Sequence, residues 1–157
     1  MTHQRPKTFA ELGGELNTLA DAFLKARVCA YNAGNKNTLR RACKELERLE
    51  DRMGFVLLRR SMIRNACAAV TDALRLVSAP AWVMDSSAAV WTHFDDNDCT
   101  ETRYRVRVDF ASEELRERDT GALIAELKKR GYTAVDYGAE AASLIMELKR
   151  QTATKKD

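Results

Sequence analysis

Three arginines within residues 102–110 have the spacing expected of a binding surface. Arg103, Arg105 and Arg107 alternate with apolar residues, and in a β-strand such alternate residues share one face, about 7 Å apart. This distance is close to the separation of successive phosphates, and guanidinium groups bind phosphates and carboxylates through paired hydrogen bonds. The row could therefore bind a nucleic-acid backbone or an acidic protein surface. The alternative is a solvated sheet face on which carboxylates of a neighbouring strand pair with the arginines.

Two residues of the preceding predicted strand, Trp91 and His93, have rings that could stack on nucleobases beside this row. Whether they share the basic face depends on the register of the two strands. A slip of one residue would move every side chain of a strand to the other face. The sequence leaves both arrangements open.

A second candidate surface lies on a predicted helix. Residues 53–58 are apolar on every side of that helix, so a contact with one other helix cannot bury them all. Three arginines follow: Arg59, Arg60 and Arg64. Arg60 falls on the apolar stripe itself, where it must extend to water or meet a carboxylate of a partner. Together with Phe55 and Leu58, these arginines are predicted to contribute to an interaction site.

A cluster of acidic residues could bind a divalent cation, because oxygen-rich clusters suit magnesium or calcium. Its members are Asp95, Asp96, Asp98 and Glu101. The spacing of an EF-hand is absent, and a polar hairpin turn explains the same residues.

The four cysteines include no Cys-x-x-Cys pair, so no structural zinc site is expected. There is also no glycine-rich phosphate loop and no Gly-x-Ser-x-Gly motif. No catalytic residue, metal ligand or cofactor is therefore predicted.

A long apolar stripe organises the N-terminal half of the chain. Its members are spaced alternately three and four residues apart, as in packed helices, with one break where the pattern falls on Arg60. They are Leu39, Ala42, Leu46, Leu49, Met53, Val56, Ile63, Cys67, Val70, Leu74 and Val77. A helix start at Thr8 and a helix stop at Gly34 precede most of the stripe. Residues 8–79 are thus predicted to form a helical hairpin, or a three-helix unit if the chain breaks near Gly54. The same stripe could make a homodimer.

The periodicity changes after Pro80. Alternating apolar residues and turn residues predict two strands, a helix, another strand and a last helix. Their ranges are 89–94, 102–110, a turn of helix capped by Ser112 and then a helix from the N-cap Asp119 to Arg130, 132–137 and 139–150. The predicted class is α+β, in which the helical unit packs on a small C-terminal sheet of β-β-α-β-α order spanning residues 80–150. Residues 1–7 and 151–157 are predicted to be a disordered arm and tail, and the rest one compact domain.

The composition is that of an ordinary folded protein. The 157 residues are 45% hydrophobic and 31% charged, and the net charge of +3 comes from 26 basic and 23 acidic side chains. This charge does not by itself indicate nucleic acid. No apolar run approaches the roughly 18 residues of a membrane span, and the N-terminus carries no apolar signal segment. A cytoplasmic location without membrane contact is expected.

These features favour a non-enzymatic binding protein, a small regulator or inhibitor that acts by protein–protein interaction with a larger assembly. Missing catalytic motifs and a helical stretch that is apolar on all sides support this interpretation. The alternative is a protein that binds nucleic acid directly through the arginine-lined strand. A metal-dependent enzyme that uses the acidic cluster is the third hypothesis.

Overall fold

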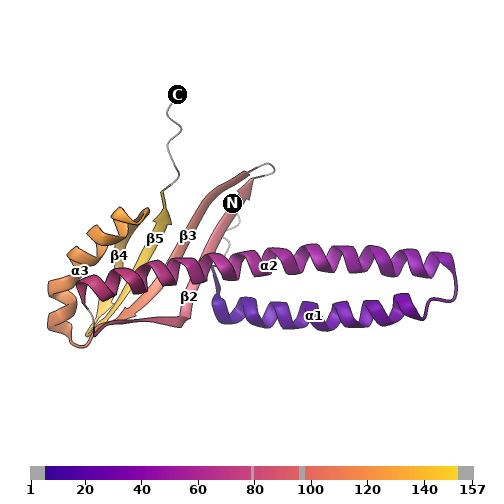
Figure 1. Ribbon diagram of the computed structural model, residues 1–157, viewed down its shortest axis with the longest axis horizontal. Coiled ribbons are helices and arrows are strands. Elements are labelled where there is room, and N and C mark those ends of the chain that lie inside the picture. The colour runs from indigo at the N-terminus through magenta and orange to yellow at the C-terminus, as the bar shows by residue number, and fades with distance from the viewer. Residues whose placement is uncertain (1–5, 79, 96–97, 152–157) are drawn as a thin grey trace, which may run out of the picture. The chain divides into compact units, whose positions relative to one another are not determined.

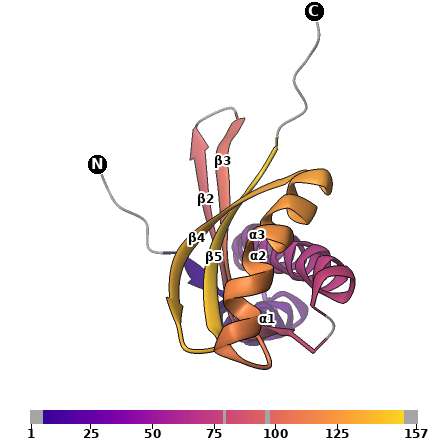
Figure 2. The same cartoon turned by 90° about the vertical axis from the view of Figure 1, so that its left-hand side faces the viewer.

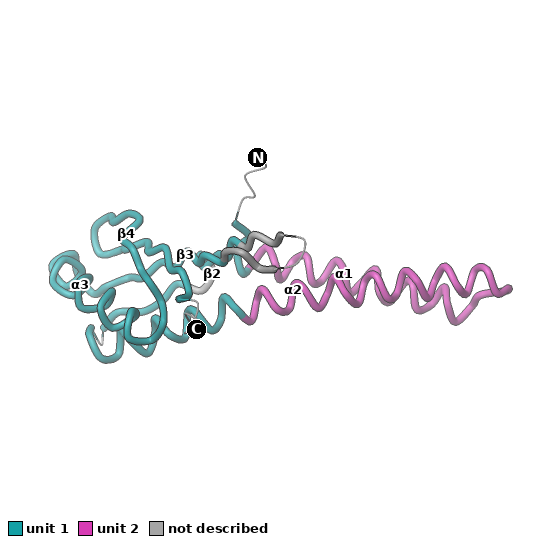
Figure 3. The backbone as a smooth tube through the Cα atoms, turned by 90° about the horizontal axis from the view of Figure 1, so that it is seen from above, with its two compact units in different colours: residues 1–9, 62–157 teal, residues 10–61 magenta. Residues whose placement is uncertain are grey.

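The computed structural model describes residues 6–78, 80–95 and 98–151 of the chain. It has the predicted α+β class, with two long helices followed by an antiparallel sheet and a third helix (Figure 1). The elements are β1 (Lys7–Thr8), α1 (Phe9–Tyr31), α2 (Lys36–Val77), β2 (Trp82–Asp95), β3 (Asp98–Asp109), α3 (Glu113–Lys129), β4 (Tyr132–Glu140) and β5 (Ser143–Arg150). They form two compact units, residues 10–61 and residues 1–9 with 62–157 (Figure 3).

The first unit is the predicted helical hairpin. Within residues 10–61, α1 and the N-terminal part of α2 run side by side in opposite directions (Figure 1). The second helix begins after Asn35, whose Oδ1 accepts a hydrogen bond of 2.8 Å from the backbone N–H of Thr38. This is an N-cap, which satisfies an amide that the helix itself leaves without a partner. Leu12 of α1 is buried, as are Ala42 and Leu49 of α2.

Helix α2 runs through Gly54 without a break, so the hairpin alternative is confirmed over the three-helix one. One glycine weakens a helix interior by only about 1 kcal/mol relative to alanine, which burial of the heptad stripe outweighs. The stripe continues with Ile63, Val70 and Leu74, all buried. These residues belong to the second unit. The boundary between the units therefore falls inside α2, whereas the sequence placed a boundary after residue 79.

The second unit is a five-stranded sheet of order β1-β2-β3-β5-β4, in which every neighbouring pair is antiparallel. Helix α3 and the C-terminal part of α2 lie on one face of the sheet (Figure 2). The strands bury alternate residues beneath these helices, as the period of two requires. The buried residues of β3 and β5 are Tyr104, Val106, Val108, Leu144, Met146 and Leu148. This layer is the core, and the opposite sheet face carries Arg103, Arg105 and Arg107.

The predicted last helix over residues 139–150 is wrong, because this stretch forms the end of β4, a turn and β5. The observed order is therefore β-β-α-β-β after the two long helices. Strand β5 pairs with β3 on one side and β4 on the other, so its backbone groups are satisfied by the sheet. Alanine, methionine and glutamate favour helices by only a few tenths of a kcal/mol, and the tertiary context overrides that preference.

Three smaller predictions also need correction. Lys7, assigned to a disordered arm, pairs with Val90 in β1. Gln151, assigned to the tail, donates a backbone hydrogen bond of 2.8 Å to the carbonyl of Gly131. Ser112 caps α3, as expected, but Asp119 lies within that single helix. There its hydrogen bond with Arg118 holds the pKa of the Asp119 carboxyl below its usual value. Residues 1–5 and 152–157 lie outside the described part of the chain.

The turn between β4 and β5 contains a strained residue. Ala141 has φ of 51°, a left-handed conformation that disfavours residues with a Cβ by about 1–2 kcal/mol. Two hydrogen bonds hold the turn: Arg116 Nε donates to the Ala141 carbonyl at 2.6 Å, and the Phe110 N–H donates to the Ala142 carbonyl at 2.8 Å. The surrounding contacts therefore maintain a conformation that alanine itself disfavours.

Replacing Ala141 with glycine is expected to raise the free energy of unfolding by about 0.5–1 kcal/mol, because glycine relieves this strain but loses more entropy on folding. Urea denaturation would measure the change. Ala139→Gly, at a position in β4 without positive φ, should destabilise the protein instead. Equal destabilisation by both changes would contradict the strain at Ala141.

Candidate functional site

The register of β2 against β3 answers the question that the sequence left open. Trp91 pairs with Arg103, and Arg103 pairs with Lys149 of β5 on its other side. Directly paired residues of antiparallel strands point to the same face. Trp91 therefore lies on the same sheet face as the arginine row. The backbone of His93 pairs with Glu101, while the side chain of His93 is outside the described part of the structure.

Arg103 contacts both a carboxylate and an aromatic ring. Its Nη1 lies 3.1 Å from Oε1 of Glu147, and its Cζ lies 5.3 Å from the centroid of the Trp91 ring. The Arg103 and Glu147 side chains are 44% and 21% exposed, respectively. An ion pair this exposed stabilises a protein by about 1 kcal/mol or less. Water and dissolved anions can therefore compete for this guanidinium.

Arg105, next in the row, has a different environment. Its Cζ lies 4.4 Å from the centroid of the Tyr137 ring on β4. Its Nε is buried and has no hydrogen-bond partner among the described residues. A buried donor without an acceptor costs about 1–3 kcal/mol, more when it is charged. Because this atom is closed to water, a ligand oxygen could accept a hydrogen bond from it only after the Arg105 side chain moved.

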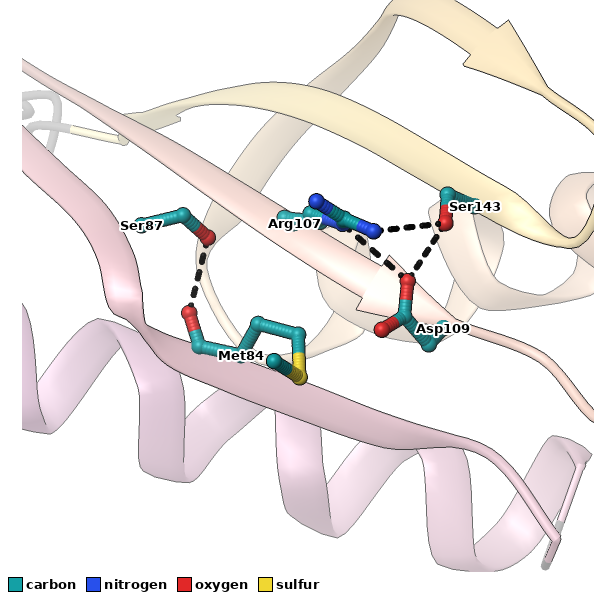
Figure 4. A network of polar contacts seen from close by, with 5 residues as sticks. All are labelled: Met84, Ser87, Arg107, Asp109 and Ser143. Carbon is teal, nitrogen blue, oxygen red and sulfur yellow. Dashed lines mark hydrogen bonds and ion pairs between the residues drawn. The ribbon is translucent and has the colours of Figure 1, made fainter.

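Arg107, the third arginine, is held within the protein (Figure 4). Its Nε lies 3.1 Å from Oδ1 of Asp109, and its Nη2 donates to Oγ of Ser143 at 3.1 Å. Ser143 Oγ in turn donates to Asp109 Oδ1 at 2.6 Å. The carboxylate of this network lies on β3 itself, whereas the Arg103–Glu147 pair is the cross-strand pairing predicted as the alternative for the row. Arg107 is therefore less available to a ligand than Arg105.

The same view includes a hydrogen bond in an irregular stretch of β2. The pairing of β2 with β3 shifts between Met84 and Ala89, and Ser87 Oγ donates a 2.9 Å hydrogen bond to the Met84 carbonyl within this irregular stretch (Figure 4). Extra residues in one strand change which residues face each other farther along. This irregularity thus helps to determine the side of the sheet on which Trp91 lies.

A groove of about 380 Å³ lies over this face. Its volume is within the roughly 300–1,000 Å³ of small-ligand pockets. Its lining combines apolar residues, two guanidiniums and one carboxylate. The lining residues are Pro6, Ala89, Trp91, Arg103, Tyr104, Arg105 and Glu147. We call this set, together with Tyr137, the sheet groove.

The helical candidate residues lie in both units. Phe55, Leu57 and Leu58 of the hairpin are 52%, 51% and 53% exposed, in agreement with a stretch that one neighbouring helix cannot bury. The guanidinium of Arg60 passes α1 at Gly13, where an added Cβ would lie 3.5 Å from Nη2. This is an ordinary van der Waals distance, so alanine at position 13 would also leave room for the arginine.

Arg59 is half-buried on the hairpin, whereas Arg64 belongs to the unit that contains the sheet. The Cζ of Arg64 lies 5.8 Å from the centroid of the Phe9 ring. The structure therefore does not gather Arg59, Arg60 and Arg64 within one compact unit. Sequence spacing had grouped them on a single helix.

Glu147 and Tyr137 of the sheet groove were not identified as site residues from the sequence. Glu147 was assigned to a helix, so its place opposite Arg105 in the register was hidden. Tyr137 was assigned correctly to a strand, but nothing local indicates that this strand lies beyond β5, at the edge of the sheet. An alternating reading of Leu144, Met146 and Leu148 was the signal that could have identified β5.

Within the described residues, no group of three histidines, cysteines, aspartates or glutamates could hold a metal ion. The acidic cluster is not tested by this, because Asp96 lies outside the described residues and the side chains of Asp95, Asp98 and Glu101 are not described. Among the helices that the structure describes, none is both long and apolar enough to cross a lipid bilayer.

Comparison with known protein families, curated proteins and solved structures finds no match to this chain.

Proposed function

We propose that this chain is a non-enzymatic binding protein that binds nucleic acid through the sheet groove. The observation that carries the proposal is the register that puts Trp91 beside Arg103 on an exposed sheet face. Arginines alone would fit any acidic surface, but arginines among exposed rings fit a ligand with both phosphates and bases. This makes nucleic acid, the second hypothesis from the sequence, the first choice.

The environment of Arg105 gives an energetic reason to expect phosphate binding in the sheet groove. Its buried Nε has no acceptor in the described part of the molecule, and the Tyr137 ring lies against its guanidinium. If the Arg105 side chain moved so that a phosphate oxygen could reach Nε, the donor would gain a charge-assisted hydrogen bond, which is roughly twice as strong as a neutral one. Binding would thus remove an unfavourable feature of the unbound protein.

The test is a fluorescence-anisotropy titration of a labelled oligonucleotide at increasing salt concentration. Two or three phosphate contacts should lower the affinity by about 10- to 40-fold between about 50 and 300 mM salt, because binding releases condensed counterions. An affinity that does not change with salt would show that phosphate contacts do not carry the binding.

A protein partner remains the second candidate, because the hairpin exposes apolar side chains around a shallow groove of about 390 Å³. This groove is lined by Glu50, Asp51, Gly54, Phe55 and Leu58. Its apolar floor and acidic rim favour a partner helix that has an apolar face flanked by basic residues. The chain would then act as a regulator or inhibitor of the partner. A homodimer through the heptad stripe has less support, since Ala42, Leu49 and Val56 are already buried within one chain.

A synthetic amphipathic peptide of leucine and lysine provides a defined probe for this second candidate. Phe55→Glu should weaken its binding by about tenfold or more, because the change puts a charge on the apolar floor. Calorimetry would measure the affinity. Arg105→Glu, in the other unit, is the matched control and should leave it unchanged. If the peptide binds wild type and Phe55→Glu equally well, the hairpin groove is not its site.

A further inference from the structure

The sheet groove contains its own carboxylate, and the position of that carboxylate indicates how a ligand would enter. Glu147 stands opposite Arg105 in the β3–β5 register and forms the ion pair with Arg103. Its negative charge therefore lies between the two guanidiniums of the groove. A phosphate that approaches these arginines would have to occupy the same place.

We propose that the sheet groove binds single-stranded nucleic acid, and that a phosphate of the strand displaces the Glu147 carboxylate from Arg103. This inference rests on the proposed function and specifies the ligand class and the competing group. Glu147 is then an internal competitor that occupies the phosphate position while the groove is empty. Its negative charge lowers the affinity for the strand by repulsion, without a direct contact between Glu147 and the strand.

The exposed rings favour a single strand over a duplex. Tyr137 is 57% exposed, and Trp91 is half-buried along the wall of the groove. In a duplex the bases are stacked and paired, so their faces are not available to protein rings. A single strand can turn its bases outward and stack them on aromatic side chains, at about 1–3 kcal/mol per base.

The order of these groups across the sheet fits a short stretch of such a strand. Trp91 contacts Arg103 on one side of the groove, and Tyr137 contacts Arg105 on the other. The guanidiniums lie between the rings, and Glu147 lies among them. A base at each ring with a phosphate between them would use both rings and both guanidiniums of the groove.

The exchange is energetically feasible because the internal pair is weak. The Arg103 side chain is almost half exposed, so its bond to Glu147 is screened by water and salt. A phosphate can form paired, charge-assisted hydrogen bonds with the same guanidinium. After the exchange Glu147 would remain near the phosphate and repel it. Removing the charge of Glu147 should therefore strengthen binding.

The experiment compares the full-length wild type with Glu147→Gln in titrations of an oligothymidylate of about ten nucleotides. Glu147→Gln should bind about three- to fivefold more tightly at low salt. Glu126→Gln is the matched control, since it removes a carboxylate that pairs with Arg130 on α3, which lies against the other face of the sheet, and it should leave the affinity within about twofold of wild type. A hairpin duplex of the same length should bind at least about tenfold more weakly. Glu147→Ala has the same expected gain and serves if the glutamine variant does not fold.

The stacking of a base on Trp91 can be measured separately, by tryptophan fluorescence. The chain has two tryptophans, so a Trp82→Phe background leaves Trp91 as the single indole reporter. Its fluorescence should be quenched when the oligothymidylate binds, because the base stacks on the ring. Binding without quenching would overturn the placement of a base at Trp91.

The outcomes separate this inference from the proposed function. If Glu147→Gln binds no more tightly than wild type while Arg105→Glu abolishes binding, the exchange is wrong and the nucleic-acid site stands. If duplex and single strand bind equally, the ligand class is wrong. If the wild type binds neither oligonucleotide, the proposed function itself fails.

Discussion

Arg105→Glu is expected to reduce the affinity for single-stranded DNA on the order of 100-fold at low salt. The change removes the guanidinium that lies over Tyr137 and puts a second carboxylate opposite Glu147. A ligand phosphate would lose a charge-assisted hydrogen bond and meet two negative groups instead. Fluorescence anisotropy with a labelled oligonucleotide would measure the loss, and the slope of affinity against salt should fall together with it.

Lys128→Glu is the matched control for this charge reversal. It changes the net charge by the same amount, but Lys128 is exposed on α3, which lies against the other face of the sheet (Figure 2). Its effect should stay within about threefold, since a screened charge on the far side acts weakly through salt solution. Similar losses for both variants would mean that binding follows overall charge and not the sheet groove.

Leu148→Ala is expected to lower the free energy of unfolding by about 2–5 kcal/mol, the range for a buried leucine that leaves a cavity. Leu148 is 0% exposed on β5, where it pairs with Tyr104 on one side and Ala134 on the other. The surrounding strands cannot collapse easily into the space, because both sides of β5 are fixed by hydrogen bonds. Urea denaturation monitored by circular dichroism would measure the change.

Ile145→Ala provides the control on the same strand. Ile145 is 36% exposed on the opposite sheet face, so its loss should cost about 1 kcal/mol or less. The two variants Leu148→Ala and Ile145→Ala also test whether this stretch is a strand or a helix. In a helix, residues three apart share a face, so both changes would be similarly severe. Equal losses would contradict β5 and favour the helix that the sequence predicted there.

Periodicity revealed those parts of the fold in which local pattern and tertiary contacts agree. Ala42, Leu49, Val56, Ile63 and Val70 are seven residues apart, and all are buried. Only a helix packed along its length produces that repeat. In β3, the alternation of arginines with apolar residues likewise predicted both the strand and its two faces.

The prediction of a helix over residues 139–150 failed because the sequence pattern there is short and ambiguous. Leu144, Ile145 and Leu148 fit a helical stripe, while Leu144, Met146 and Leu148 fit a strand equally well. The surrounding residues favour helix in isolation. Its position between β3 and β4 depends on contacts far apart in sequence, which no local window contains.

Only half of the candidate site could be predicted from the sequence, for the same reason. The arginine row is local to β3 and was visible in the sequence. Its partners Trp91, Tyr137 and Glu147 come from three other strands, and their placement depends on register and strand order. A one-residue difference in β2 would have put Trp91 on the other face. The register and the strand order are therefore determined by contacts across the whole folded sheet.

The two edges of the sheet also bear on how the protein avoids forming fibres. An unpaired edge strand offers a row of amide and carbonyl groups to which another chain can add. Strand β4 forms one edge, and its register shifts between Asp136 and Gly138, which interrupts the regular row. At the other edge, β1 covers only Ala89 and Val90 of β2. The rest of that edge is β2 itself, whose register shifts between Met84 and Ala89 and again between His93 and Phe94. Both edges are therefore poor templates for adding another strand, so we expect the protein to resist edge-to-edge polymerisation at concentrations where a sheet with long, regular edges would aggregate.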